Sequence, residues 1–293
     1  MPIPADGEAR PAVPDDAPIT IIEAKKGWLP IDFHELVTHR ELLFFLIWRD
    51  VKVRYKQTVL GASWAIIQPV FSMVIFSIIF GSFAKMPSDG IAYPVFVYAA
   101  LLPWTFFANA VSSAGLSLVS QTNLLTKIYF PRLYMPISAV GVGVVDLALS
   151  FAVYVLIVVY YVMFQGTAPV PGASILLLPG LVLLTIFAAC GMGFLLASIT
   201  VVYRDFRHIV PFMMQAWMYA TPVVYPMSML PEKYRPIMAL NPMAGIIGGY
   251  RSVLLNQTID WQNLAISAAV ACGLFIFGMY NFRRTERFLA DVA

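Results

Sequence analysis

The sequence predicts an all-α integral membrane protein with six transmembrane helices, and three observations support this fold class. Hydrophobic residues make up 60% of the 293 positions and charged residues only 12%, whereas soluble domains average about 25% charged residues. The apolar residues gather in six runs, and a helix of roughly 20 apolar residues crosses a bilayer. Fifteen of the 19 Lys and Arg residues fall in segments on one side of these runs, which places those segments and both termini in the cytoplasm.

The first 31 residues are expected to form a cytoplasmic tail. Residues 1–20 are rich in Pro, Ala and Asp and contain no apolar core, so they do not resemble a signal peptide and are expected to be disordered. Asp32 can cap a following helix, because Glu35 stands at the third position of a capping-box spacing.

Residues 32–60 are predicted to contain an amphipathic helix that lies in the membrane interface. Its apolar residues Phe44, Trp48, Val51 and Tyr55 recur at helical spacing, and Asp50 stands one turn before Arg54. The cations form a second row, and no charge follows until residue 85. A basic helix that leads into a long apolar run is typical of an interface helix followed by a span. The alternative is that basic residues simply precede any first span. The row consists of Arg49, Lys52 and Lys56.

The predicted transmembrane domain covers residues 61–281, and a cytoplasmic tail, 282–293, follows it. The fifth run is short for a span, so its bounds are the hardest to place. A multi-pass protein of the cytoplasmic (inner) membrane follows from this arrangement. The six runs are 62–83, 93–119, 136–163, 175–202, 210–224 and 264–280.

The external segment 226–261 is long, mostly apolar and interrupted by four prolines. Broken backbone at membrane depth is tolerated only against protein or a water-filled cavity. We therefore expect two short re-entrant helices on the external side, the alternative being an ordinary amphipathic surface loop. Its marked residues are Asn241, Pro242, Tyr250 and Arg251.

Motifs along the chain resemble the permease subunit of type-2 ABC exporters, in the branch that exports lipid-linked polysaccharides such as O-antigen, capsule and teichoic-acid chains. The resemblance extends from about residue 21 to the end. Its motifs are the run 48–58, Leu60-Gly61 with Trp64 and Pro69, Leu-Leu-Pro-Trp at 101–104, the run 123–132, Tyr203-Arg204-Asp205, and Asn241-Pro242 followed by Tyr250-Arg251.

The resemblance implies a homodimer of this chain, with two copies of a cytoplasmic nucleotide-binding ATPase that carry ATP and Mg. The sequence agrees with a separate ATPase, because it contains no P-loop motif and no Gly-Lys dipeptide. We also find no catalytic motif and no metal-binding motif, so no cofactor is expected on this chain and no catalysis by it alone. The net charge of +3 is too small to suggest nucleic acid. Membrane lipids and a lipid-linked glycan are the expected small partners.

Two short cytoplasmic loops combine aromatic or apolar residues with charge, which suits insertion into a groove of a partner. In the family these loops would couple the permease to its ATPase. The alternative is plain positive-inside anchoring, which explains the cations but not the aromatics. The candidate coupling residues are Asn123, Leu125, Lys127, Tyr129, Tyr203, Arg204, Asp205, Phe206 and Arg207.

The cations of the interface helix also suit phosphate. We therefore expect the lipid pyrophosphate head of the substrate to pass near Arg49, Lys52, Arg54 and Lys56. Asp146 is the one carboxylate well inside a predicted span. Helix packing by hydrogen bonds and proton coupling both remain open for it, and packing is favoured because no second intramembrane acid or His accompanies it.

Aromatic rings offer a flat apolar face to sugars, and the chain has 21 Phe, 14 Tyr and 6 Trp. Interfacial belts and packing are the alternatives for most of them. The candidates for lining a sugar path are Trp64, Gln68, Ser72, Trp104, Phe107, Trp217, Tyr219 and Tyr225.

Three other functions stay open on the sequence. A drug or small-lipid exporter of the same superfamily would have a narrower path with fewer aromatics. A membrane-embedded transferase acting on lipid-linked sugars would need carboxylates in a cavity, and only Asp146 is available. An ATP-independent channel would lack a nucleotide-binding partner.

Overall fold

The computed structural model describes residues 37, 39–56, 63–120, 130–166, 168–203 and 205–292, with side chains described up to residue 286. Within these ranges the chain forms helices and no strands, as the sequence predicts. The described residues belong to one unit, Phe33–Ala293. The expectations for the tail, for the helix start at residue 32 and for residues 57–62 lie outside the described part of the chain.

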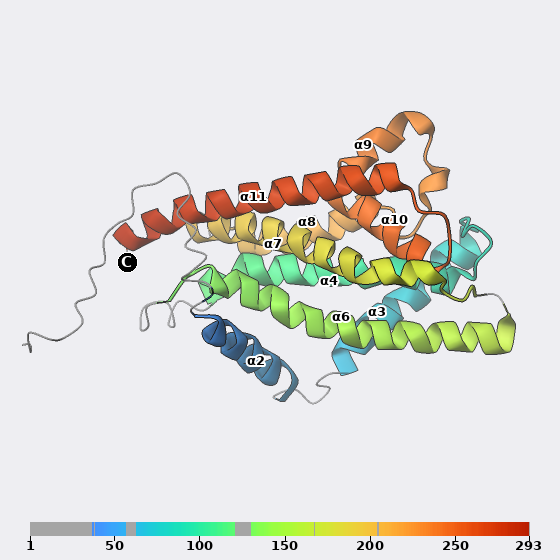
Figure 1. The fold of residues 1–293 in the computed structure, drawn as a ribbon, viewed down its shortest axis with the longest axis horizontal. Helices are drawn as coiled ribbons and strands as arrows, with labels where there is room; N and C mark the ends of the chain where they lie inside the picture. Colours follow the sequence, from blue (N-terminus) through green and yellow to red (C-terminus); the bar gives the residue numbers. More distant parts are fainter. Residues whose placement is uncertain are drawn as a thin grey trace, which may run out of the picture. The chain divides into compact units, whose positions relative to one another are not determined.

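Five helices are long and apolar enough to cross a membrane (Figure 1). They coincide with five of the six predicted runs, because an uninterrupted apolar run has to satisfy its backbone internally. Two of them end in a π-helical turn and one begins with a 3-10 turn. The five are α3 (Ser63–Phe76) continued by Ser77–Phe83, α4 (Tyr93–Ser120), α6 (Tyr134–Tyr160) continued by Tyr161–Gln165, α7 (Leu178–Val202) after Ala173–Leu177, and α11 (Trp261–Val292).

The run predicted at 210–224 forms a shorter helix, α8, at Phe206–Ala220. It has 15 residues, fewer than the roughly 20 that cross a bilayer core. Residues 221–224, which the sequence included in the span, are buried but not helical. α8 therefore does not meet the length of a span, and the described residues contain five spans of full length rather than six.

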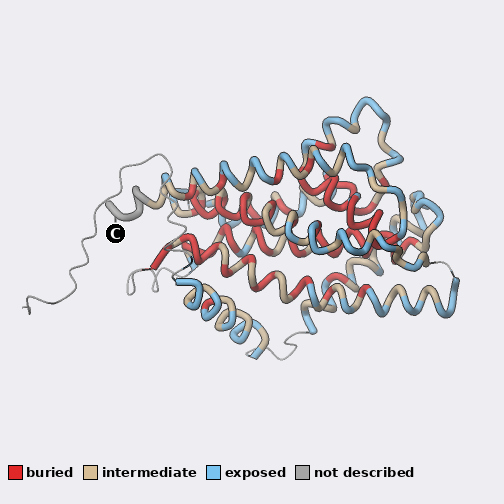
Figure 2. Tube along the Cα trace, viewed as in Figure 1, coloured by how far each residue is buried: buried red, intermediate tan, exposed pale blue. Residues whose placement is uncertain are grey.

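α4 is the central helix of the bundle. In its most apolar stretch 78% of the residues are buried, against 11% in α3, and α4 packs on α3, α6, α7, α8 and α10. Figure 2 shows the buried positions concentrated in α4, α7 and α10, whereas α3 and much of α11 are exposed. A helix that is apolar all round is expected at the centre of a membrane bundle. The peripheral helices are left with surfaces for lipid or for another chain.

Small residues bring α7 and α11 into backbone contact. A Cβ atom added to Gly191 would stand 2.5 Å from the backbone nitrogen of Phe275, and one added to Gly278 would overlap the carbonyl oxygen of Gly191. Such close approach of two helices is the usual role of glycine in membrane bundles. The last long helix is thereby fixed against the body of the fold.

The segment 226–261, expected to be external, contains two 3-10 turns, Met227–Met229 and Glu232–Tyr234, and two helices, α9 (Arg235–Ala239) and α10 (Pro242–Leu254). α10 is buried at 12 of its 13 positions, and it packs on α4, α7 and α11. A Cβ atom on Gly245 would stand 2.5 Å from the Asn263 carbonyl oxygen, so α10 lies directly on α11.

Candidate functional site

Helix α2 (Arg40–Lys56), predicted to lie in the membrane interface, packs against α6 (Figure 1). Its contact residues are Leu46, which is buried, and Ile47, whose Cδ1 atom would lie 2.7 Å from a Cβ atom added to Gly141. Phe44 and Trp48, by contrast, are exposed. Apolar residues thus lie on two sides of α2, one packed on α6 and one exposed.

The predicted cationic row of α2 divides into different environments. The Arg49 guanidinium pairs with the neighbouring Asp50, with Nη2 at 2.7 Å from Oδ1. Lys52 and Lys56 are exposed. Of the four cations proposed for the substrate headgroup, Arg54 alone reaches a carboxylate of another described helix.

Asp146, inside α6, is held by two residues of α2. Its Oδ2 atom lies 2.8 Å from Arg54 Nη1, an ion pair without a well-aligned hydrogen bond. Its Oδ1 atom accepts a hydrogen bond from the Tyr55 hydroxyl. Burial raises the pKa of Tyr55, and the bond to Asp146 raises it further, so the hydroxyl stays protonated and donates.

This arrangement corrects one inference from the sequence. Arg54 does not pair with Asp50 one turn earlier, because Asp50 is taken by Arg49 and Arg54 turns toward α6. Asp146 agrees with the favoured packing alternative, because α2 supplies both its hydrogen bond and its ion pair. The partners come from the interface helix, 91 residues away from Asp146 in the case of Tyr55, and no local pattern indicates such a pair.

A cavity of about 430 Å³ opens beside this cluster, between α2, α3, α4 and α6. The ionisable residues of its wall are Arg54, Tyr55 and Asp146, and the other polar groups are neutral. Gly143 of α6 lets the Phe106 ring approach closely, since an added Cβ atom would lie 3.2 Å from its Cε2 atom. The lining also includes Trp64, Ala65, Gln68, Pro69, Thr105, Phe106, Asn109, Leu147 and Ser150. Thr105 and Asn109 were not anticipated from the sequence, because α4 reads as a uniformly apolar run.

Only two of the aromatic and polar residues proposed for a sugar path reach this cavity, Trp64 and Gln68. Trp64 is exposed over 58% of its surface and presents its ring at the start of α3. Ser72, which lies one turn beyond Gln68, is half-buried and does not line the cavity. A flat ring beside neutral amides and hydroxyls is a surface on which a sugar can stack and form hydrogen bonds.

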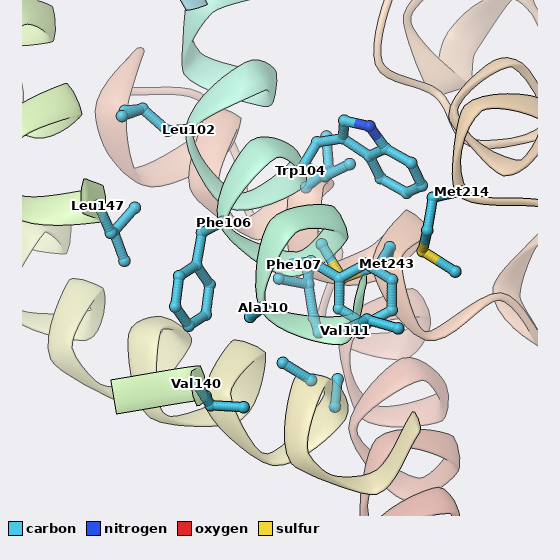
Figure 3. Close-up of a cluster of buried hydrophobic side chains, with 14 of the residues drawn as sticks. Leu102, Trp104, Phe106, Phe107, Ala110, Val111, Val140, Leu147, Met214 and Met243 are labelled. Carbon is cyan, nitrogen blue, oxygen red and sulfur yellow. The ribbon is translucent and has the colours of Figure 1, made fainter. Parts of the chain in front are cut away.

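Trp104, Phe107 and Trp217 pack on one another inside the chain. Their ring centroids lie 5.5 to 6.5 Å apart, and Trp104 and Phe107 are almost fully buried. Figure 3 shows Trp104 and Phe107 within the apolar core, near Met214 of α8. These three residues therefore follow the packing alternative. Tyr219 is exposed, and the backbone carbonyl of Tyr225 accepts a hydrogen bond from Arg251.

The second candidate coupling loop lies where α7 ends and α8 begins. Tyr203 is exposed over 63% of its surface, and its ring lies 6.4 Å from that of Phe206. Asp205 and Arg207 are exposed beside them. Aromatic rings thus stand at the end of the bundle with charges around them, as a docking element requires. The remaining candidates, Arg204 and the four residues between 123 and 129, lie outside the described ranges.

The external motif residues form a bonded unit. Asn241 caps α10 by accepting a hydrogen bond from the Met243 nitrogen at 3.1 Å, and its amide donates to Thr221. Arg251 donates to the carbonyl oxygens of residues 222, 223 and 225 at 2.5 to 3.0 Å. The Arg251 guanidinium also lies 3.8 Å above the Phe96 ring. Burial lowers the pKa of Arg251, but an arginine stays charged at neutral pH. Tyr250 is buried beside it.

Among the described residues, no group of three His, Cys, Asp or Glu side chains is placed to hold a metal ion. The candidate site is the cavity at the junction of α2 with α3, α4 and α6, which brings together Arg54, Trp64 and Gln68 from the sequence-based candidates.

Comparison with known proteins places the chain beside membrane transporters. The model of the ABC-2 type transporter family matches residues 41–255. The O-antigen export system permease protein RfbA of Myxococcus xanthus is 30% identical over 86% of this chain and 96% of that protein. A Klebsiella pneumoniae protein of the same name is 26% identical over 86% and 95% of the two chains. The polysialic acid transport protein KpsM of Escherichia coli is 21% identical over 82% and 92%.

Proposed function

The chain belongs to the ABC-2 type transporter family, and we propose that it is the transmembrane subunit of an ATP-driven exporter of a lipid-linked polysaccharide. The observation that carries this proposal is the match to relatives named for O-antigen export and polysialic acid transport, along 92% or more of their length. O-antigen and capsule chains are thus the substrate classes best supported. A teichoic-acid chain has the same chemistry of a polymer on a lipid phosphate.

The cavity beside α2 supports a lipid-linked glycan rather than a small drug. It combines a cation, an exposed indole ring and neutral hydrogen-bonding groups, which suit a phosphate followed by a sugar. It also lies between the interface helix and the first span, where a lipid-linked substrate would enter from the cytoplasmic leaflet. A transferase would need acid–base pairs, and Asp146 is the one carboxylate of this wall.

We place two copies of this chain with two ATPase subunits in the working exporter. A single bundle of this size encloses no polymer path, and a symmetric pair would form one at its two-fold axis. α3 and α11 supply exposed apolar surface for lipid or for the second copy. ATP and Mg would be bound by the ATPase, and the loop with Tyr203, Asp205, Phe206 and Arg207 would dock on it. Residues 123–129 would join that contact.

We also propose six spans, with both termini in the cytoplasm of a cell whose inner membrane holds the exporter. α8 packs on α4 and α7, and residues 221–224 extend it as buried backbone, so the two together approach the length of a crossing. α9 and α10 then lie on the external side as re-entrant helices. Burial of α10 against α4, α7 and α11 supports this placement, since exposed irregular backbone is excluded from the bilayer.

Deletion of the gene tests the function. We expect loss of one surface polysaccharide and accumulation of its lipid-linked precursor inside the cell, with recovery when the wild-type chain is supplied. A normal surface polymer in the deletion strain would point to a drug or small-lipid exporter. Absence of the precursor itself would favour the transferase. Purification of the tagged chain without a nucleotide-binding subunit would favour an ATP-independent channel.

A further inference from the structure

Arg54 and Asp146 are the two oppositely charged groups in the wall of the cavity beside α2. They belong to different helices, lie 2.8 Å apart, and differ in exposure, with 44% of the Arg54 side chain and 12% of the Asp146 side chain exposed. The arginine can therefore be reached from outside the pair, whereas the carboxylate is enclosed. Neutral groups make up the remaining polar part of the wall.

A carboxylate inside a span is costly and requires partners. Asp146 contacts Arg54 and Tyr55, which both come from the last turn of α2. The planar guanidinium of an arginine can bind a carboxylate or a phosphate through two parallel hydrogen bonds. In this structure the Asp146 carboxylate lies where such an anion would lie beside Arg54. A phosphate that reached Arg54 would meet the negative charge of Asp146 a few ångströms away, and the repulsion grows as the surroundings become less polar.

We propose that Arg54 is the phosphate-binding residue of this cavity and that Asp146 is an internal counter-ion, which the phosphate of a lipid-linked substrate must displace. The identity of the substrate rests on the proposed function, whereas the competition between Asp146 and a phosphate for Arg54 does not. The phosphate belongs to the substrate's lipid pyrophosphate rather than to bulk phospholipid, because Trp64 and Gln68 in the same wall can receive the sugar that follows it.

Displacement has a mechanical consequence for α2. The helix is fixed to α6 by Leu46, by Ile47 at Gly141, and by the contacts of Arg54 and Tyr55 with Asp146. Loss of the ion pair removes the charged part of this contact and leaves the apolar part. Arrival of a substrate anion thereby loosens the end of α2 that leads toward the first span. Asp146 then links headgroup binding to the position of α2.

If Asp146 and the phosphate compete for Arg54, removing the negative charge of Asp146 should tighten the binding of an anion. Probe binding is measured on the purified chain in phosphatidylcholine nanodiscs, with farnesyl pyrophosphate as the probe. Asp146→Asn should bind the probe about tenfold more tightly than wild type, because the neutral amide no longer repels it and Arg54 is partly screened by solvent. Arg54→Gln should weaken binding by a similar factor, and the double variant should bind as weakly as Arg54→Gln alone.

Two matched controls separate this site from general surface charge. Glu41→Gln removes an exposed acid and Arg40→Gln an exposed cation at the other end of α2, roughly 20 Å from Arg54 along the helix. Neither should change probe affinity by more than about twofold, because salt screens exposed charges at that distance. Inorganic pyrophosphate and phosphatidylglycerol-containing nanodiscs form two further arms. Competition by pyrophosphate with little effect of phosphatidylglycerol identifies the substrate head as the ligand.

A second measurement does not depend on any variant. Hydrogen exchange of α2 in the wild-type chain should become faster when farnesyl pyrophosphate binds, since the helix loses its ion pair to α6. Slower or unchanged exchange, or an Asp146→Asn variant that binds the probe no better than wild type, would overturn the proposal and leave the pair as a structural clamp. Either result leaves the export function to the deletion experiment, which does not involve this pair.

Discussion

At the scale of single residues, two arginines of the family motifs have opposite environments. Arg251 is enclosed by three backbone carbonyls and the Phe96 ring, so both of its terminal nitrogens are bonded inside the fold. Arg54 has a carboxylate on one side and a cavity on the other. The first residue therefore holds residues 222–225 against α10, whereas the second lines a cavity.

Replacement of Arg251 by Lys should destabilise the protein strongly. A lysine keeps the charge but cannot reach three carbonyls with one planar fork, and unsatisfied buried carbonyls remain. We expect Arg251→Lys to lower the free energy of unfolding by about 2–4 kcal/mol, measured as thermal unfolding in detergent. Arg235→Lys is the matched control, because Arg235 donates to one carbonyl, that of Leu230 at 3.2 Å. Equal effects of both changes would contradict the assigned role.

The sequence predicted residue types better than residue partners. Asp50 and Arg54 have the spacing of a helical ion pair, yet each pairs elsewhere, because the pairing depends on which side of α2 faces α6. Trp104 and Trp64 are both tryptophans near the start or middle of a span. Trp104 is buried because α8 packs against α4 and brings Trp217 to it. Trp64 lies in the wall of a cavity instead.

At the scale of elements, hydropathy located five of the spans closely, because the bilayer requires long apolar helices whatever their neighbours. It could not predict how closely the helices approach. That distance depends on glycines at particular positions, such as Gly191 and Gly278 between α7 and α11. Other glycines of the same helix face open space, as Gly273 does, and a single sequence does not distinguish them.

This difference between two glycines of α11 can be tested directly. Gly278→Ala places a methyl group into the Gly191 backbone, so it should lower the free energy of unfolding by about 1–3 kcal/mol. Gly273→Ala meets no atom within 4 Å and should be neutral or slightly stabilising, because alanine favours a helix by up to about 1 kcal/mol over glycine. Thermal unfolding of the two purified variants decides the matter. A stable Gly278→Ala variant would mean that α7 and α11 are not in backbone contact.

At the scale of the whole molecule, the exporter must transmit work from ATPase to bundle, and the loop before α8 is the described candidate. We expect Tyr203→Ala combined with Asp205→Ala to lower export per ATP hydrolysed about fivefold or more, the lower range of coupling energies between sites. Vesicles that contain the complex with its ATPase provide the measurement. Tyr234→Ala is the control, because this tyrosine is similarly exposed but lies in the external segment. Normal export per ATP in the double variant would remove the loop from the coupling path.

The fold class was predictable because composition and charge bias act along the whole chain, whereas the number of crossings depends on one helix. α8 has 15 residues and carries Pro211 within it. Its continuation at 221–224 is buried by Arg251 and by Tyr93, whose hydroxyl donates to the Val224 carbonyl at 2.7 Å. These contacts satisfy the backbone of a non-helical stretch, which hydropathy alone assigns to a longer helix.

Site-directed cysteine labelling can count the crossings. If α8 crosses, a cysteine at Asp205 is cytoplasmic and one at Lys233 is external, and a membrane-impermeant maleimide added to intact cells modifies only the second. Both positions are exposed, so lack of reaction reports sidedness rather than burial. Lys85→Cys should behave as external and Arg284→Cys as cytoplasmic, in a background without Cys190 and Cys272. If α8 does not cross, Asp205→Cys and Lys233→Cys lie on the same side. An odd number of spans would then put residue 284 on the side opposite the interface helix, against the distribution of basic residues that first oriented the chain.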